Sequence, residues 1–128
     1  MKVAFSTTDG IYANEHFGRS GLFAIYEVDE NEYRFVEMRS FAVGTDLEIV
    51  RSRDTEEHES LVEKKIEKLS DCKIIYVTAV GGPSAARLIK KNIFPVKVKD
   101  DTRIVDELEK LKDSLKNKKI PWLQKNNL

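Results

Sequence analysis

The sequence has little sulfur chemistry and no long apolar segment. Cys72 is the single cysteine among 128 residues, so the chain forms no internal disulfide and no metal site of several thiolates. No apolar run approaches the ~18 residues that are needed to span a bilayer. The first residues also lack a basic segment followed by an apolar stretch, so we expect no signal peptide. Together these absences predict a cytoplasmic protein without a membrane partner.

The charge balance has no excess of either sign. The chain has 22 basic and 22 acidic residues, which give a net charge of zero. A nucleic-acid-binding protein usually carries a basic face, whereas mixed charges are typical of a solvated surface. We therefore expect no nucleic-acid partner.

The N-terminal third reads as three strands with one long loop. β-Forming residues alternate in Lys2–Thr7, Leu22–Val28 and Tyr33–Ser40, which predicts an antiparallel meander. Residues 8–21 contain three glycines and have no clear period, as expected of a loop. In the third strand, the expected faces are Tyr33, Phe35 and Glu37 on one side and Arg34, Val36 and Met38 on the other.

The remainder alternates helices and strands after a polar connection over Phe41–Glu57. Helical spacing predicts helices over His58–Leu69, from Gly82 to about Lys91, and a last helix capped by Asp101 or Thr102. The expected inward residues, helix by helix, are Leu61, Val62, Ile66 and Leu69, then Ala85, Ala86, Leu88 and Ile89, then Ile104, Val105, Leu108, Leu111 and Leu115. The lysines that alternate with Glu63–Glu67 are expected on the solvent side.

Two further strands, Lys73–Val80 and Phe94–Val98, lie between these helices. The first is a nearly continuous apolar run, which is typical of a strand buried on both faces. The proline at position 95 marks the second as an edge strand. The whole chain, 1–128, is expected to be one domain with a short C-terminal tail over about 117–128.

This order of elements predicts the topology. Strand–helix–strand crossovers are right-handed and make their strands parallel, so we expect a mixed five-stranded α/β sheet in the order 3-2-1-4-5, with three helices. The connections of the adjacent first and fourth strands leave in opposite directions, and ligands of open sheets bind at such a switch point. The loop with His16, the Gly81-Gly82 turn and the Phe41–Glu57 connection all reach this end, whereas Cys72 lies at the other.

A cluster of candidate binding residues follows from this placement. A neutral imidazole is a good ligand for iron, and its second nitrogen is usually held by an acceptor, for which Glu15 and Asp9 are nearby. Backbone N–H groups at a helix start attract anions. The candidate cargo-binding residues are therefore His16, Phe17, Gly18, Arg19, Thr8, Asp9, Gly81, Gly82 and Ser84, with His16 as the metal ligand.

Each candidate also has a structural interpretation that the sequence leaves open. His16 is otherwise an exposed turn residue, and Arg19 is either a counter-charge or a surface residue. Gly81, Gly82 and Ser84 are otherwise a plain strand-to-helix turn, and Thr7, Thr8 and Asp9 are otherwise turn formers. His58 is expected on the surface at a helix start, with a lesser claim to metal, and Cys72 is expected to be a small buried hydrophobic residue.

Three blocks carry a family resemblance over essentially the whole chain. They are Met1–Phe5, His16-Phe17-Gly18 with Phe23–Val28, and Val80–Arg87. Together they resemble the dinitrogenase iron–molybdenum cofactor biosynthesis family. The segments Tyr33-Arg34-Phe35 and Ile120-Pro121-Trp122-Leu123 are similar to the NifX group of that family.

The resemblance implies a ribonuclease-H-like fold and a carrier function. The transient cargo would be the iron–sulfur precursor of the iron–molybdenum cofactor, received from NifB and exchanged with the NifEN scaffold. The family's cluster-associated histidine lies in the His-Phe-Gly motif and so corresponds to His16. The resemblance assigns nothing to His58 or Cys72.

A ribonuclease-H-like fold also raises the possibility of a nuclease, which needs several carboxylates on central strands to hold two metal ions. Lys2–Thr7 and Ile74–Ala79 contain no acidic residue, and no nucleotide-binding glycine pattern occurs. We therefore expect a protein that is not an enzyme. The alternative is a protein-interaction or regulatory module that binds no cluster, and Asp54–Glu57 and Lys116–Lys119 are candidate docking segments under either hypothesis.

Overall fold

The structure is a computed structural model that describes residues 1–41 and 55–117, with the side chains of residues 55–60 not included. Its central sheet has five strands in the order β4-β3-β1-β5-β6. The strands are β1 (Lys2–Ser6), β3 (Leu22–Val28), β4 (Tyr33–Ser40), β5 (Cys72–Val77) and β6 (Phe94–Lys97). β1 pairs antiparallel with β3 and parallel with β5, so the sheet is mixed. The predicted mixed α/β sheet with three helices is confirmed.

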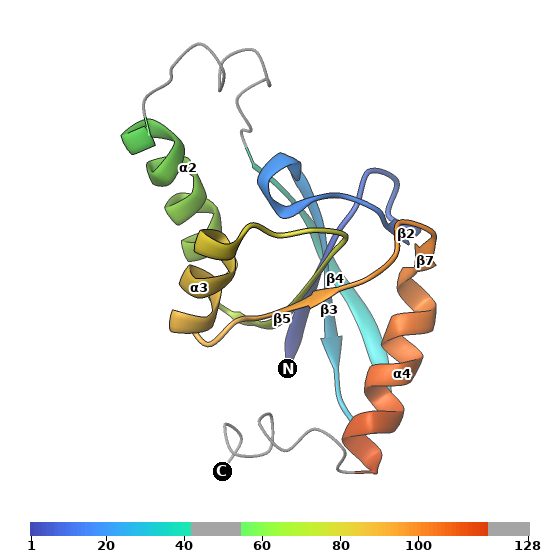
Figure 1. Cartoon of the computed structure of the whole chain (residues 1–128). Helices are drawn as coiled ribbons and strands as arrows, with labels where there is room; N and C mark the ends of the chain where they lie inside the picture. The colour runs from blue at the N-terminus through green and yellow to red at the C-terminus, as the bar shows by residue number, and fades with distance from the viewer. Residues whose placement is uncertain (42–54, 118–128) are drawn as a thin grey trace.

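The three helices cover both faces of the sheet (Figure 1). Helices α2 (Thr55–Lys68) and α3 (Gly82–Lys90) lie on one side, and α4 (Ile104–Lys116) lies on the other. Each side has its own buried core: Val62, Ile66 and Leu88 belong to the first, and Leu108 and Leu111 to the second. None of the helices in the described ranges is long and apolar enough to cross a membrane.

The strand arrangement differs in detail from the prediction, because two short strands form a second sheet. Strand β2 (Tyr12–Ala13) pairs antiparallel with β7 (Thr102–Arg103). Ala13 is fully buried in the core beneath α4, so the predicted loop between β1 and β3 is anchored to the start of α4.

The ends of several elements also differ from the prediction. Helix α2 starts at Thr55, so residues 55–57 are helical and do not belong to the connection; residues 42–54 of that connection lie outside the described part. Helix α4 has Arg103 at its N-cap position and no side-chain cap, because Thr102 is occupied in β7. The predicted tail, beyond Asn117, also lies outside the described residues.

The helices bury narrower apolar stripes than predicted. Leu61, Ile89 and Val105 expose 41%, 51% and 41% of their surface, and Ala86 is exposed. A helix on a flat sheet buries only residues spaced by three or four positions. These four residues lie just outside that stripe.

Strand β4 contains a bulge that reverses its faces. Ile25 pairs with Glu37 and Tyr26 with Phe35, which leaves Val36 as an extra residue. Because side chains alternate along a strand, one extra residue moves those beyond it to the opposite face. The predicted faces are therefore wrong for Glu37 and Met38.

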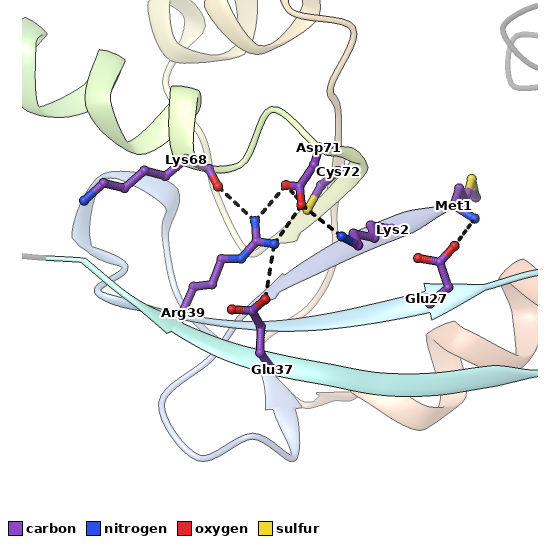
Figure 2. A network of polar contacts seen from close by, with 8 residues as sticks. All are labelled: Met1, Lys2, Glu27, Glu37, Arg39, Lys68, Asp71 and Cys72. Carbon is purple, nitrogen blue, oxygen red and sulfur yellow. Dashed lines mark hydrogen bonds and ion pairs between the residues drawn. The ribbon is translucent and has the colours of Figure 1, made fainter.

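A polar network closes the end of the sheet where β1 and β5 begin (Figure 2). The Arg39 Nη1 and Nη2 atoms donate to both carboxylate oxygens of Asp71, each at 2.7 Å. Arg39 Nη1 also donates to the Lys68 carbonyl at 2.9 Å, and Lys2 Nζ donates to Asp71 at 3.4 Å. The network thus joins β4, the end of α2, and the starts of β1 and β5.

Candidate functional site

The loop with His16 is fixed against the end of β5. The Thr78 N–H donates to the Glu15 carbonyl at 3.0 Å, and the Phe17 N–H donates to the Ala79 carbonyl at 2.9 Å. His16 and Ala79 thereby form an isolated parallel bridge. This pairing ends β5 at Val77, earlier than the predicted Val80, and places His16 beside the turn that leads into α3.

The same loop is tied to β1 by buried hydroxyl groups. Ser6 Oγ donates to Ser20 Oγ at 2.7 Å and lies 3.2 Å from the Glu15 carbonyl. Both serines are fully buried. The backbone on either side of His16 is therefore held by β1 and β5 together.

A short 3-10 turn, η1 (Phe17–Arg19), follows His16. Phe17 is fully buried, whereas His16, Gly18 and Arg19 are exposed. Phe17 packs in the core on the α2 side and anchors the turn. One buried aromatic ring thus holds the imidazole and the guanidinium at the surface.

The imidazole of His16 makes no hydrogen bond to residues 1–41 or 61–117. Of its predicted acceptors, Asp9 accepts from the Tyr12 and Ile11 N–H groups at 3.0 and 2.9 Å, which lowers the pKa of its carboxyl. The backbone carbonyl of Glu15 accepts from the Thr78 N–H. Both nitrogens of His16 are therefore available to a ligand in the described part of the molecule.

Thr7, Thr8 and Asp9 make the hydrogen bonds of a compact turn. Thr7 Oγ1 accepts from the Gly10 N–H at 2.9 Å, and Thr8 exchanges hydrogen bonds with the Asn14 side chain. Gly10 has φ +77°, a conformation that glycine adopts without steric cost. These contacts agree with turn formation, and a role of Thr8 and Asp9 in cargo binding stays a prediction.

The glycine turn beside His16 is open. Gly81 is the N-cap of α3, and because glycine has no side chain it cannot cap the helix. Pro83 lies in the first turn. A Cβ built on Gly18, Gly81 or Gly82 would meet nothing within 4 Å. The first-turn N–H groups of a helix have no acceptor within the helix itself, so this turn combines open space with free donors near His16, as the sequence predicted.

One buried hydroxyl at this end has no partner in the described residues. Thr78 Oγ1 is buried and makes no hydrogen bond. Such an unsatisfied group costs free energy, about 1–3 kcal/mol in typical cases. Thr78 directly precedes the Ala79 that bridges His16, and no sequence pattern distinguishes it from its neighbours.

Sequence reasoning missed the most unusual charge near the loop. Lys65 of α2 was expected on the solvent side, but it is 7% exposed. Its Nζ donates to the Phe17 carbonyl at 2.8 Å and lies 5.0 Å from the centroid of the Phe17 ring. Burial lowers the pKa of Lys65 to about 8. Lys65 lies three positions after Val62 and four before Leu69, so helical spacing places it within the buried stripe of α2, and this signal could have identified it.

Cys72 lies apart from His16. It is buried at the start of β5, beside Lys2, as predicted for a small hydrophobic residue. His58 belongs to α2, and its side chain lies outside the described residues. Within the described part, no three histidine, cysteine or acidic side chains come together as a metal site.

A pocket of about 300 Å³ lies elsewhere, between α2 and α3. It contains none of the predicted site residues, and its walls carry charges of both signs. Its lining residues are Glu63, Ile66, Glu67, Arg87, Lys90 and Lys91.

Fold and site together define an open-sheet α/β domain with an exposed histidine turn at its switch point. A family model described as "Dinitrogenase iron-molybdenum cofactor" matches residues 1–114, and the chain belongs to this family. The recognised resemblance is thereby confirmed, and it connects the chain with the biosynthesis of that cofactor.

The relatives of the chain agree with this assignment. It is 39% identical to the protein NifX of Herbaspirillum seropedicae, covering 98% of this chain and 80% of that protein. It is 34% identical to NifX of Sinorhizobium fredii (strain NBRC 101917 / NGR234), covering 98% and 76%. It is also 34% identical to part of the FeMo cofactor biosynthesis protein NifB of Frankia alni, covering 77% of this chain and 18% of that protein.

A solved structure shares the fold. The crystal structure of PH0822 superposes with a TM-score of 0.60 at 16% identity, covering 88% of this chain and 90% of that one. At this identity the likeness concerns the fold alone.

Proposed function

We propose that the protein is a non-catalytic carrier of an iron–sulfur precursor of the iron–molybdenum cofactor, with His16 as the ligand to the cargo. The observation that carries the proposal is the exposed imidazole without a hydrogen bond, fixed between β1 and β5 beside an open glycine turn. Family membership supplies the class of cargo. Exchange with NifB-type and NifEN-type assembly proteins in the cytoplasm, and the ribonuclease-H-like assignment of the fold, belong to the same proposal.

The chemistry of the site suits an anionic metal–sulfur cargo. Neutral imidazole is a good ligand for iron. Backbone N–H groups at the start of α3 favour negative charge, and Arg19 makes no ion pair among the described residues. A single protein ligand binds weakly enough to release its cargo to an acceptor protein.

The test is an anaerobic titration with the isolated iron–sulfur precursor that NifB produces, followed by gel filtration and iron analysis. We expect stoichiometric iron on the parent protein and at least a tenfold loss of affinity in His16→Ala. Cys72→Ala is the matched control, because it removes the other soft metal ligand at the opposite end of β5 and should bind like the parent.

Other outcomes would change the proposal. Binding that survives His16→Ala moves the ligand elsewhere, and His58→Ala is then the next variant. Absence of iron on the parent protein contradicts the carrier function and leaves the interaction module, whose partner a pull-down would identify.

A further inference from the structure

Lys65 is a buried cation in direct contact with the histidine turn. Its Nζ donates to the Phe17 carbonyl at 2.8 Å across 48 positions of sequence, and it lies over the Phe17 ring. The residue exposes 7% of its surface. No carboxylate within residues 1–41 and 61–117 pairs with it, so its charge is held by a carbonyl dipole and an aromatic face.

This arrangement costs folding free energy that an apolar side chain would avoid. Burying an ammonium group without a carboxylate partner is expensive, and replacing such a charge by a hydrophobic residue of similar volume is often neutral or stabilising. The stability of α2 therefore does not require a lysine here. The hydrogen bond that Lys65 donates to the Phe17 carbonyl in the neighbouring turn explains why a lysine occupies this buried position.

The carbonyl that Lys65 binds controls the geometry of the turn. Phe17 is the first residue of η1, and its carbonyl also accepts from the Ser20 N–H at 3.3 Å. Its N–H donates to the carbonyl of Ala79, two residues after β5. The peptide groups before and after Phe17 are thus fixed from two directions, by the segment that follows β5 and by α2. His16 and Gly18 lie directly on either side of these groups.

We propose that Lys65 is a positioning residue of the cargo site. From α2, its hydrogen bond to the Phe17 carbonyl holds the His16-Phe17-Gly18 turn in place. The proposal rests on the proposed function for its consequence, which is binding of the cargo by His16. The positioning itself concerns only the free protein and is measurable without cargo.

The first experiment compares Lys65→Met with the parent by amide hydrogen exchange under native conditions, observed by NMR. Loss of the hydrogen bond between Lys65 and the Phe17 carbonyl should speed hydrogen exchange of the Arg19 and Ser20 amides at least tenfold. The exchange rate of the Ile75 amide in β5 should stay unchanged. Lys64→Met is the matched control, because it removes the same charge from an exposed neighbouring position. Equal protection of the turn in Lys65→Met and the parent would overturn the proposal.

The second experiment measures affinity for the NifB-made iron–sulfur precursor in the same variants. We expect at least a tenfold weaker affinity for Lys65→Met, recovery of most of it in Lys65→Arg, and no change in Lys64→Met. A uniform increase of exchange across β5 would indicate a general stability role and also contradict the proposal. If the parent binds no precursor, the proposed function fails, and the exchange data still decide whether Lys65 positions the turn.

Discussion

The two ends of the sheet differ in whether their charged side chains form ion pairs. At the end where β5 begins, Arg39, Asp71 and Lys2 form a connected network, and the N-terminal amine pairs with Glu27 at 2.9 Å (Figure 2). At the end where β5 finishes, His16 and Lys65 have no carboxylate partner among the described residues, and hydrogen bonds to backbone carbonyls and between two buried serines hold the loop. Ion pairs thus join the elements at one end, whereas hydrogen bonds hold the loop at the other.

Among the substitutions that test this comparison, Arg39→Met is expected to have the largest effect on the free energy of unfolding. The two hydrogen bonds to Asp71 are bidentate, and the Arg39 side chain is 17% exposed, a geometry that makes an ion pair stronger than an ordinary surface pair. We expect the free energy of unfolding in urea to fall by about 2 kcal/mol, with no change in affinity for the iron–sulfur precursor. Arg34→Met, on the same strand and exposed, is the control. A weakened affinity in Arg39→Met would show that the two ends are coupled.

The second prediction concerns how the stability of the protein depends on pH through Lys65, at the histidine end of the sheet. The pKa of Lys65 is lowered by burial from 10.5 to about 8. Between these values the unfolded state binds more protons than the folded state, so stability rises with pH. We expect the stability of the parent relative to Lys65→Met to increase by about 2 kcal/mol from pH 8 to pH 10.5, measured by urea denaturation at each pH. Taking the difference between the two proteins cancels the contributions that they share.

A flat difference curve would contradict the description of Lys65 as a desolvated cation. It would place the lysine with the solvated charges of the surface. The contrast between the two ends would then rest on His16 and Arg19 alone.

Substitution in the glycine turn is expected to change the stability of the protein less. Gly81 has φ −69°, and an added Cβ meets nothing within 4 Å, so we expect Gly81→Ala to change stability by less than about 0.5 kcal/mol. Gly10→Ala is the contrasting control, because its φ of +77° makes a side chain cost about 1 kcal/mol or more. Thermal denaturation of both variants measures this. A large loss in Gly81→Ala would mean that the turn is more tightly packed than the structure shows.

The sequence predicted the architecture because hydrophobic periodicity and connection chirality are strong signals. The central position of β1 beside β5, and the placement of the His16 loop and the Gly81 turn at the same end of the sheet, follow from these rules alone. The placement of Cys72 at the far end of β5 follows in the same way. These features depend on the order of the elements and tolerate errors in their boundaries.

The misses have local physical causes. The bulge at Val36 is one extra residue with no special composition, and the pairing of Tyr12–Ala13 with β7 is a contact between distant segments. Lys65 was missed because a lysine in an acidic, lysine-rich helix predicts a solvent-facing position, although its spacing from Val62 and Leu69 places it within the buried stripe of α2. Its partner, the Phe17 carbonyl 48 positions away, leaves no periodic trace in the sequence.

The last prediction concerns the thiol of Cys72, which is buried at the ionic end and should react slowly. Burial raises the pKa of this thiol to about 12, and the thiolate is the reactive species. We expect a disulfide reagent at pH 8 to label the native protein at least about a hundredfold more slowly than the urea-unfolded protein. Arg39→Met should label faster than the parent, because the network that joins β4 to the start of β5 is cut. Rapid labelling of the native parent would show that this end opens readily, and the division between a closed ionic end and an available histidine end would then be wrong.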